Sequence, residues 1–292
     1  REIVTITTRF APSPTGPLHL GHAFAAFVAH DMARATAGRF LLRIDDIDRT
    51  RARATYETGI YSDLAGLGLT WDGPVMRQSE RTDRYRAGVE PLWQAGLVYP
   101  CTCSRRDIAE AATAPQEGSP VHGPDGIVYP GTCRSRRRTG HLPRDAALRL
   151  DMRMALDCID TPIRLVERNR NLTRPAPEIV DGIGDIVLSR KDFPGSYHLA
   201  VVLDDADQGV TLVTRGEDLF EATWIHVVLQ QLLSLPSPRY HHHALVRDET
   251  GRRLAKRDDA KAVARYLADG ASPAELRRLT GAPSPCGGLQ AS

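Results

Sequence analysis

The sequence predicts an α/β fold in which a parallel sheet is interrupted by an inserted domain. A strand, a shaped loop, a helix and a second strand follow one another within the first 45 residues, which is the order of a βαβ unit. Strand-like apolar segments return only after residue 195, beyond a cysteine-bearing region. The expected organisation is a first half of the core at 1–98, an inserted α+β domain at 99–190, the second half of the core at 191–240 and a short helical region at 241–292.

The individual elements follow from residue types and spacing. Ile3–Thr8 is short and β-branched, as buried strands are, and Pro12–Pro17 cannot form regular structure. Apolar residues recur at helical spacing from Leu20 to Ala37, and Arg39–Ile44 follows as the second strand. Further along, the patterns predict helices at 49–67, 78–96 and 221–234, strands at 199–203 and 210–214, a flexible insertion at 111–126 and a disordered tail after 283.

The composition is that of a globular protein without a membrane span. Hydrophobic residues make up 41% and charged residues 25% of the chain, and no apolar run approaches the ~20 residues needed to cross a bilayer. The first residues do not form a signal-peptide pattern, so we expect a cytoplasmic location.

Basic residues are unevenly distributed, although the net charge is only +2. Seven arginines stand between Arg134 and Arg153 against two aspartates, and nine basic residues face six acidic ones from His241 to the end. Such patches suit a phosphate backbone, and a solvated arginine face is an equally good interpretation.

Three of the five cysteines are close in sequence. Cys101, Cys103 and Cys133 lie within 33 residues, and in a cytosolic chain such a group indicates a metal site sooner than a disulfide. A tetrahedral zinc site needs four ligands, and residue type alone favours His122 or His141 as the fourth.

The loop between the first strand and its helix, Arg9–His22, carries the strongest chemical pattern. In open α/β sheets ligands bind beyond the carboxyl ends of the strands, where this loop lies. Gly21 lets a ligand approach the backbone closely, and the helix amides that follow favour a negative group. His19 and His22 are three residues apart, so both can donate hydrogen bonds to phosphate oxygens. A His-x-x-His pair alone is equally consistent with a metal pair or with structural histidines.

The whole string Pro-Ser-Pro-Thr-Gly-Pro-Leu-His-Leu-Gly-His at 12–22 resembles the HIGH signature of class I aminoacyl-tRNA synthetases, in the form found in their glutamyl and glutaminyl branch. The resemblance covers roughly residues 5–260. It implies a Rossmann-type catalytic core that joins an amino acid to ATP as an adenylate, with Mg²⁺ accompanying the ATP. It also implies that His19 and His22 are catalytic and that they bind ATP together with Gly21.

The same resemblance assigns an amino-acid site. Asp45, after the second strand, stands where the family has an acidic residue, usually glutamate, that holds the α-ammonium group. From the residues alone, the carboxylates at 45, 46 and 48 could instead bind a cation or cap a turn. Tyr197 and Arg215 match positions that close over the amino acid, and a guanidinium there favours L-glutamate over glutamine. The remaining substrate positions are Arg9, Ala11 and Ser13.

A basic segment, Arg252–Arg257, resembles a degenerate KMSKS loop. The resemblance implies that Lys256 reaches the ATP phosphates and stabilises the leaving pyrophosphate, and that Leu254 contacts ATP. The first lysine and the serine of that motif are replaced here by Arg253 and Ala255. Catalysis would come from alignment of the carboxylate with the α-phosphate and from cations at the developing charge.

Two features resemble a shorter family, the glutamyl-queuosine tRNA(Asp) synthetases. Their Cys-x-Cys and Tyr-x-x-x-Cys pattern recurs here, which implies a structural Zn²⁺ on Cys101, Cys103, Tyr129 and Cys133, with Tyr129 preferred to a histidine. Only 35 residues follow Arg257, too few for an anticodon-reading helical domain. The family resemblance implies transfer of glutamate to queuosine in the anticodon stem-loop of tRNA(Asp), and we expect a monomer.

Two other functions fit the same motifs. One is a catalytic fragment of a glutamyl-tRNA synthetase that charges tRNA(Glu). The other is a non-catalytic RNA-binding protein on a synthetase core. The RNA that becomes glutamylated separates the first from the main hypothesis, and glutamate-dependent exchange between ATP and pyrophosphate separates the second.

Overall fold

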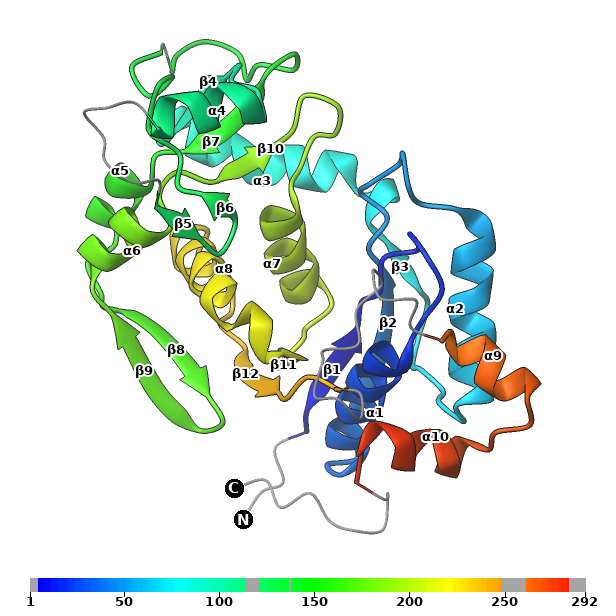
Figure 1. The fold of residues 1–292 in the computed structure, drawn as a ribbon. Helices are drawn as coiled ribbons and strands as arrows, with labels where there is room; N and C mark the ends of the chain where they lie inside the picture. The colour runs from blue at the N-terminus through cyan, green and yellow to red at the C-terminus, as the bar shows by residue number, and fades with distance from the viewer. Residues whose placement is uncertain (1–4, 114–120, 137, 248–260, 284–292) are drawn as a thin grey trace.

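The core of the computed structural model, which describes residues 5–113, 121–136, 138–247 and 261–283, is a sheet in two adjoining parts (Figure 1). The first part is parallel, in the order β1 (Thr7–Phe10), β2 (Arg39–Ile44) and β3 (Met76–Arg77). The second has the order β11 (Leu212–Gly216), β12 (Arg239–His243), β8 (Ile163–Glu167) and β9 (Arg170–Arg174), with only β8 and β9 antiparallel.

The two parts meet at β1 and the start of β11. The backbone N–H of Thr211 donates to the carbonyl of Thr7 over 3.0 Å, and the N–H of Thr7 donates to Oγ1 of Thr211 over 2.9 Å. The strand order across the core is therefore β3, β2, β1, β11, β12. From β1 the following strands are added toward one edge of the sheet, and from β11 the following strand is added toward the opposite edge. In an open parallel sheet such a switch point is where ligands bind, beyond the carboxyl ends of the strands.

Helices connect the strands of the core. Helix α1 (Leu20–Arg34) joins β1 to β2, and α8 (Phe220–Leu232) joins β11 to β12. The other core helices are α2 (Ala54–Gly66), α3 (Thr82–Gln94) and α7 (Tyr197–Asp207), with short 3₁₀ turns η1 (Gln78–Glu80) and η2 (Glu217–Leu219). Two short helices, α9 (Val263–Ala268) and α10 (Pro273–Thr280), come last, and Arg277 of α10 bonds to Asp31 of α1.

The segment at 98–189, which also contributes β8 and β9 to the core, contains a second, antiparallel sheet. Its strands are β4 (Val98–Cys101), β7 (Ala147–Leu150) and β10 (Val187–Ser189), with β7 in the middle. A small hairpin, β5 (His122–Gly123) with β6 (Gly126–Ile127), and the helices α4 (Arg105–Ala112), α5 (Met152–Asp157) and α6 (Ala176–Gly182) complete it. Figure 1 shows α7 between this segment and β1–β3.

Several predicted elements need correction. The predicted strand at 199–203 is wrong, because these residues lie within α7. The side chain of Ser196 caps that helix by accepting the N–H of Leu199, and residues 198–205 are all buried, so no exposed face reveals the helical period. The helix predicted from 49 begins at Ala54, because Asp48 accepts the backbone N–H groups of Thr50 and Arg51 in a turn.

Other predictions of secondary structure are confirmed with shifted ends. The first strand covers 7–10 rather than 3–8, and residues 1–4 lie outside the described part. Strands at 39–44 and 212–216 and helices at 20–34, 82–94 and 220–232 match the expected ones. No helix within the described ranges is both long and apolar enough to cross a membrane.

Candidate functional site

Two histidines form the N-terminus of α1, at the switch point of the sheet. His19 is the N-cap, and its Nδ1 accepts the backbone N–H of Gly21 over 3.1 Å. His22 Nδ1 accepts the backbone N–H of His19, also over 3.1 Å, so the two residues form a reciprocal capping box. Their ring centroids are 3.8 Å apart.

This capping fixes the tautomer of both rings. A ring nitrogen that accepts a hydrogen bond carries no proton, so each neutral imidazole must carry its proton on Nε2. Both Nε2–H groups are then donors at a helix N-terminus, where the helix dipole also favours a negative ligand. The predicted phosphate-contacting pair is therefore compatible with the observed backbone.

The segment predicted to contain the catalytic lysine is bounded by residues that lie at this same helix. Ala262 pairs with His19 in an antiparallel bridge, and the N–H of Val263 donates to the carbonyl of Leu18 over 2.8 Å. At the other flank, the ring of His243 on β12 contacts Phe24 of α1 at 5.1 Å between centroids. Leu254 and Lys256 themselves lie outside the described residues.

A cavity of about 200 Å³ lies beyond the carboxyl end of β2 and brings together three of the predicted glutamate-binding residues. Ser13, Asp45 and Tyr197 are among its lining residues. Ala11 is half-buried in the loop after β1, and the N–H of Asp45 is held by the carbonyl of Pro12 over 3.0 Å. The loop of the first βαβ unit and the end of β2 thus form one wall of the cavity.

The three carboxylates after β2 have separate partners, which contradicts a shared cation site. Asp45 accepts from Arg43, Asp46 accepts from the backbone and hydroxyl of Ser79, and Asp48 caps its own turn. Burial raises the pKa of Asp45 to about 6, even though the charge of Arg43 opposes that rise. A buried carboxylate with a raised pKa gains from a further cation, such as an ammonium group.

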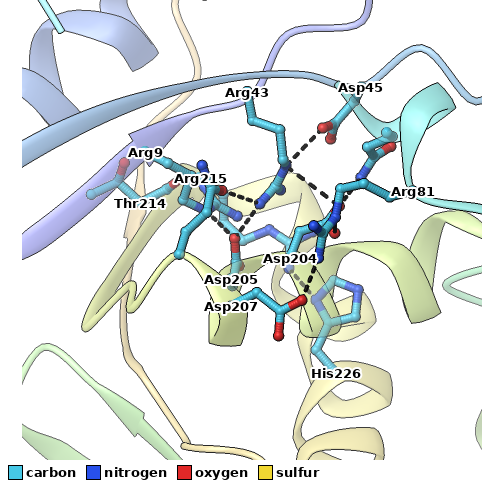
Figure 2. A network of polar contacts seen from close by, with 12 residues as sticks. Arg9, Arg43, Asp45, Arg81, Asp204, Asp205, Asp207, Thr214, Arg215 and His226 are labelled. Carbon is cyan, nitrogen blue, oxygen red and sulfur yellow. Dashed lines mark hydrogen bonds and ion pairs between the residues drawn. The ribbon is translucent and has the colours of Figure 1, made fainter. Parts of the chain in front are cut away.

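Arg9 and Arg43 belong to a buried network of charges that crosses the switch point (Figure 2). Arg43 has no exposed surface; its Nε donates to Asp45 Oδ1 over 2.9 Å and its Nη1 to Asp205 Oδ1 over 2.6 Å. Nε of Arg9 donates to the same oxygen of Asp205 over 2.9 Å. Burial raises the pKa of Asp205, but the charges of Arg9 and Arg43 outweigh it and hold the pKa below its usual value. Arg9 is therefore connected to Asp45, which lines the cavity, through Asp205 and Arg43.

Arg215 lies behind Tyr197 rather than on the cavity wall. It is 6% exposed, and its Nη2 donates to the hydroxyl of Tyr197 over 2.8 Å. Its Nη1 donates to Thr223 Oγ1 over 3.2 Å and to His226 Nδ1 over 3.0 Å. Tyr197 is 42% exposed and lines the cavity, so its hydroxyl lies between the buried guanidinium and the cavity.

The predicted metal ligands lie together. The Sγ atoms of Cys101, Cys103 and Cys133 are all within 4.8 Å of one another, and the Tyr129 hydroxyl oxygen is 3.5 Å from Cys101 Sγ and 3.4 Å from Cys103 Sγ. A tetrahedral Zn²⁺ with Zn–S of about 2.3 Å and Zn–O of about 2.1 Å places S and O about 3.6 Å apart. The four donors therefore fit a zinc ion.

The alternative histidine ligands do not belong to this group. Both His122 and His141 are exposed, and neither belongs to the group of potential metal ligands found in the described ranges. The surroundings favour an anionic cluster: Nε of Arg149 donates to Cys101 Sγ over 3.3 Å, and its guanidinium lies 4.0 Å from the Tyr129 ring centroid. The geometry therefore supports Tyr129 over either histidine.

A larger cavity, of about 1100 Å³, adjoins the small one. The two share four lining residues, and the far wall of the large cavity is formed by the cysteine cluster and the β5–β6 hairpin. The shared residues are Asp48, Arg51, Arg190 and Tyr197. The two basic side chains on this boundary pair with carboxylates, Arg51 with Asp48 and Arg190 with Asp192.

The arginine-rich stretch at 134–153 is only partly a surface patch. Arg134 pairs with Asp185, and Arg138 pairs with Asp151 and lies over the ring of Tyr99. Three other arginines, at 136, 144 and 153, are exposed. Three of the six described arginines in this stretch, Arg134, Arg138 and Arg149, therefore pair within the fold, which neither interpretation of the pattern anticipated.

Sequence patterns did not identify the buried residues that contact Arg9 and Asp45. Arg43, Asp204 and Asp205 are buried; Asp204 accepts from Gln78 and Tyr85 at 3.0 and 2.8 Å. A signal existed, because an arginine inside an apolar strand and paired aspartates inside an apolar helix need partners when they are buried. Their pairing across 162 residues is not readable from local spacing.

Comparison with known proteins assigns the family. Residues 5–280 match the family of class I tRNA synthetases (E and Q), catalytic domain. A glutamyl-Q tRNA(Asp) synthetase of Rhodobacter capsulatus is 62% identical over 94% of this chain and 99% of its own length. One of Nocardia farcinica is 44% identical over 93% of this chain and 82% of its own.

Solved structures agree with this assignment. A glutamate tRNA ligase from Elizabethkingia meningosepticum, crystallised with its amino acid, superposes with a TM-score of 0.73 and 26% identity over 92% of this chain. The chain spans 59% of the length of that ligase. A methionyl-tRNA synthetase of Mycobacterium tuberculosis shares the fold, with a TM-score of 0.60 at 13% identity.

The fold and site define a catalytic core of the ATP-dependent, amino-acid-activating type. The chain belongs to the class I tRNA synthetases of the E and Q type, and within them to the family of the glutamyl-Q tRNA(Asp) synthetases.

Proposed function

We propose that this protein activates L-glutamate with ATP and transfers the glutamyl group to queuosine in the anticodon loop of tRNA(Asp). The observation that carries the proposal is the cavity of about 200 Å³ with the Asp45 carboxylate on one side and Tyr197, backed by Arg215, on the other. An α-amino acid with an acidic side chain has the complementary charges: an ammonium for Asp45 and a carboxylate for the Tyr197–Arg215 pair.

Glutamate is proposed to bind with its ammonium at Asp45 and its side chain toward Tyr197. Arg9, Ala11 and Ser13 contribute to the same site, Arg9 through the buried network and Ser13 from the cavity wall. The guanidinium of Arg215 discriminates against glutamine because the amide NH2 of glutamine is a donor and cannot accept a hydrogen bond from the guanidinium N–H groups.

ATP is proposed to lie at the N-terminus of α1. Gly21 allows its phosphates to approach the backbone, and the Nε2–H groups of His19 and His22 stabilise charge that develops on them. Lys256 is proposed to reach the ATP phosphates and Leu254 to contact ATP; both lie outside the described residues. Mg²⁺ would accompany ATP and neutralise part of its charge.

The adenylate forms without a protein nucleophile. The glutamate α-carboxylate attacks the α-phosphorus, the bond to the bridging oxygen breaks and pyrophosphate leaves. The cavity holds the carboxylate in line, and the histidine donors stabilise the leaving group. In the second step a hydroxyl of the queuosine ring attacks the activated carbonyl and AMP leaves.

The anticodon stem-loop that accepts glutamate is proposed to enter by the cavity of about 1100 Å³. This cavity shares a boundary with the cavity of about 200 Å³, called the glutamate cavity from here on. The exposed arginines at 136, 144 and 153 are available for phosphates of the stem-loop. The names of the two relatives described above support tRNA(Asp) as the RNA.

A structural Zn²⁺ is proposed on Cys101, Cys103, Tyr129 and Cys133. Four protein donors leave no coordination position for a substrate, so the ion would hold β4 and the loop at 129–133 together beside the large cavity. The protein is further proposed to act as a monomer in the cytoplasm.

The decisive experiment offers the unmutated protein radioactive glutamate, ATP and two RNAs. Glutamate attached to queuosine-containing tRNA(Asp), and absent from the same tRNA lacking queuosine, is the expected result. Attachment at the 3′ end of tRNA(Glu) would instead identify a glutamyl-tRNA synthetase. Absence of glutamate-dependent ATP–pyrophosphate exchange would exclude adenylate formation.

A further inference from the structure

Behind Arg215, a chain of hydrogen bonds runs away from the glutamate cavity. Nη1 of Arg215 lies 3.0 Å from Nδ1 of His226, whose Nε2 lies 3.1 Å from Nδ1 of His198. Nε2 of His198 lies 3.2 Å from Oδ1 of Asp125. The three inner residues are buried, whereas Asp125 is exposed at the turn of the β5–β6 hairpin.

The direction of every bond in this chain is determined by its first member. An arginine side chain can only donate, so His226 Nδ1 must accept and the proton of that ring must be on Nε2. That Nε2–H donates to His198 Nδ1, and the proton of His198 is therefore on Nε2, from which it donates to Asp125. Burial, and then the charge of Arg215, lower the pKa of His226 well below its usual value, which keeps that ring neutral.

We propose that His226 and His198 are positioning residues for the recognition of the glutamate side chain, and that they make the affinity for glutamate depend on Asp125 in the β5–β6 hairpin. The inference rests on the proposed function and adds to it residues that touch neither glutamate nor ATP. They act through Arg215, whose planar fork binds a carboxylate in two bonds only when its orientation is fixed.

The bonds of Arg215 within the described ranges support this role. Nη1 uses both of its hydrogens on Thr223 and His226, and Nη2 uses one on Tyr197. The guanidinium plane is therefore held by three hydrogen bonds, which leave its Nε–H and one Nη2–H for a further acceptor. A group held in this way loses little freedom when it binds a carboxylate.

The outer end of the chain lies where the acceptor is proposed to enter. Asp125, Tyr197 and His198 all line the large cavity, and Tyr197 also lines the glutamate cavity. A ligand that displaces the hairpin would break the His198–Asp125 bond and loosen the two bonds behind it. The hairpin thus connects occupancy of the large cavity with the orientation of Arg215.

Buried histidines often serve only the stability of a core, and that role predicts a different result. If the pair is purely structural, its mutation changes the melting temperature and leaves the KM for glutamate unchanged. If the pair positions Arg215, its mutation raises the KM for glutamate while the KM for ATP stays constant. A variant that keeps the acceptor for Arg215 then has a KM for glutamate closer to that of the parent.

The test uses ATP–pyrophosphate exchange in the full-length protein. In His226→Asn, Oδ1 can replace Nδ1 as acceptor for Arg215 but the contact with His198 is lost; in His226→Leu both are lost. A lost hydrogen bond to a charged group predicts a rise of the glutamate KM of about 10- to 100-fold for His226→Leu, and a smaller rise for His226→Asn. Asp125→Ala is expected to raise it about 2- to 5-fold, as for one ordinary hydrogen bond.

The matched control is Asp145→Ala, another exposed aspartate of the inserted segment, which lines neither cavity. It is expected to leave the glutamate KM unchanged. If His226→Leu does not fold, the glutamate KM of His226→Asn and Asp125→Ala still tests the proposal. An unchanged glutamate KM in both of these variants overturns the proposal.

A second measurement is independent of catalysis. Nitrogen-15 NMR of the imidazole rings is expected to show a proton on Nε2 of both His198 and His226 and none on Nδ1. A proton on Nδ1 of either ring overturns the proposed direction. If the unmutated protein shows no glutamate-dependent exchange, the proposed function fails, and this spectrum still tests the chain of bonds by itself.

Discussion

The imidazoles of His19 and His22 lie with their ring centroids 3.8 Å apart, and each uses Nδ1 to accept a backbone N–H of the same helix end. Capping and chemistry are thus assigned to different nitrogens of each ring. Nδ1 caps the helix, and Nε2–H is the donor proposed to contact an ATP phosphate. The two roles can be separated by mutation.

His19→Asn is expected to lose activity and keep the fold. The asparagine Oδ1 can replace Nδ1 as the cap, but no donor stands at the position of Nε2, so the rate of ATP–pyrophosphate exchange should fall about 100-fold. His19→Ala should lose the cap as well, which costs about 1 kcal/mol and lowers the melting temperature by a few degrees. Full exchange activity in His19→Asn would contradict the assigned role.

The affinity for glutamate is expected to fall as the pH drops through about 6. Burial raises the pKa of Asp45 to about 6, and only the ionised carboxylate above that pH attracts the α-ammonium group. The profile of kcat/KM for glutamate should therefore lose activity on its acidic side with a midpoint near 6. Asp45→Asn should raise the KM about 10- to 100-fold and remove this acidic limb.

Asp63 on α2 provides a control for that pH dependence. Burial raises its pKa to about 6 as well, but it does not line the glutamate cavity. Asp63→Asn should leave the kinetic profile unchanged. Because a raised carboxyl pKa costs stability only when the group is ionised, the variant should unfold at a higher temperature than the parent at pH 8 and at the same temperature below pH 4. An acidic limb that disappears in Asp63→Asn would exclude Asp45 as its source.

Zinc is expected to bind the protein in a 1:1 ratio, and its binding is expected to require the cysteine cluster. Cys133→Ser is expected to lose the metal, measured by elemental analysis, and to lower the melting temperature, because metal binding contributes to folding free energy. Tyr129→Phe is expected to weaken zinc binding, whereas His122→Gln and His141→Gln should not. Cys158→Ser, at an exposed free cysteine outside the cluster, is the control. Full zinc content in Tyr129→Phe would exclude the phenolate as a ligand.

Replacement of Arg43 tests the buried network. Arg43→Met leaves Asp45 and Asp205 without their shared cation, and breaking a buried ion pair in this way costs about 3–5 kcal/mol of unfolding free energy. Arg106→Met removes an exposed i,i+4 pair with Glu110 and should change stability little. Denaturant unfolding measures the change in unfolding free energy for both variants. Equal changes would show that the buried pairs of Arg43 stabilise the fold no more than an exposed pair does.

Local patterns identified the first βαβ unit, because the strand, the proline-rich loop and the helix each have a short-range cause. The same patterns failed for α7, since a helix that is buried on all sides has no polar face to show its period. Three residues that line the cavity, Ser13, Asp45 and Tyr197, were found through motifs. The contacts of Arg43, His226 and Asp125 were missed because they join different elements, to which sequence spacing gives no access.

The contact between Thr7 and Thr211 has a consequence for the order of folding. It joins residues 204 positions apart, so β1 can pair with β2 early but cannot meet β11 until most of the chain has been synthesised. Until then Arg9 and Arg43 have no access to Asp205. Assembly of the substrate site is therefore a late, long-range step, and its rate is expected to be limited by closure of this loop rather than by formation of the helices that surround it.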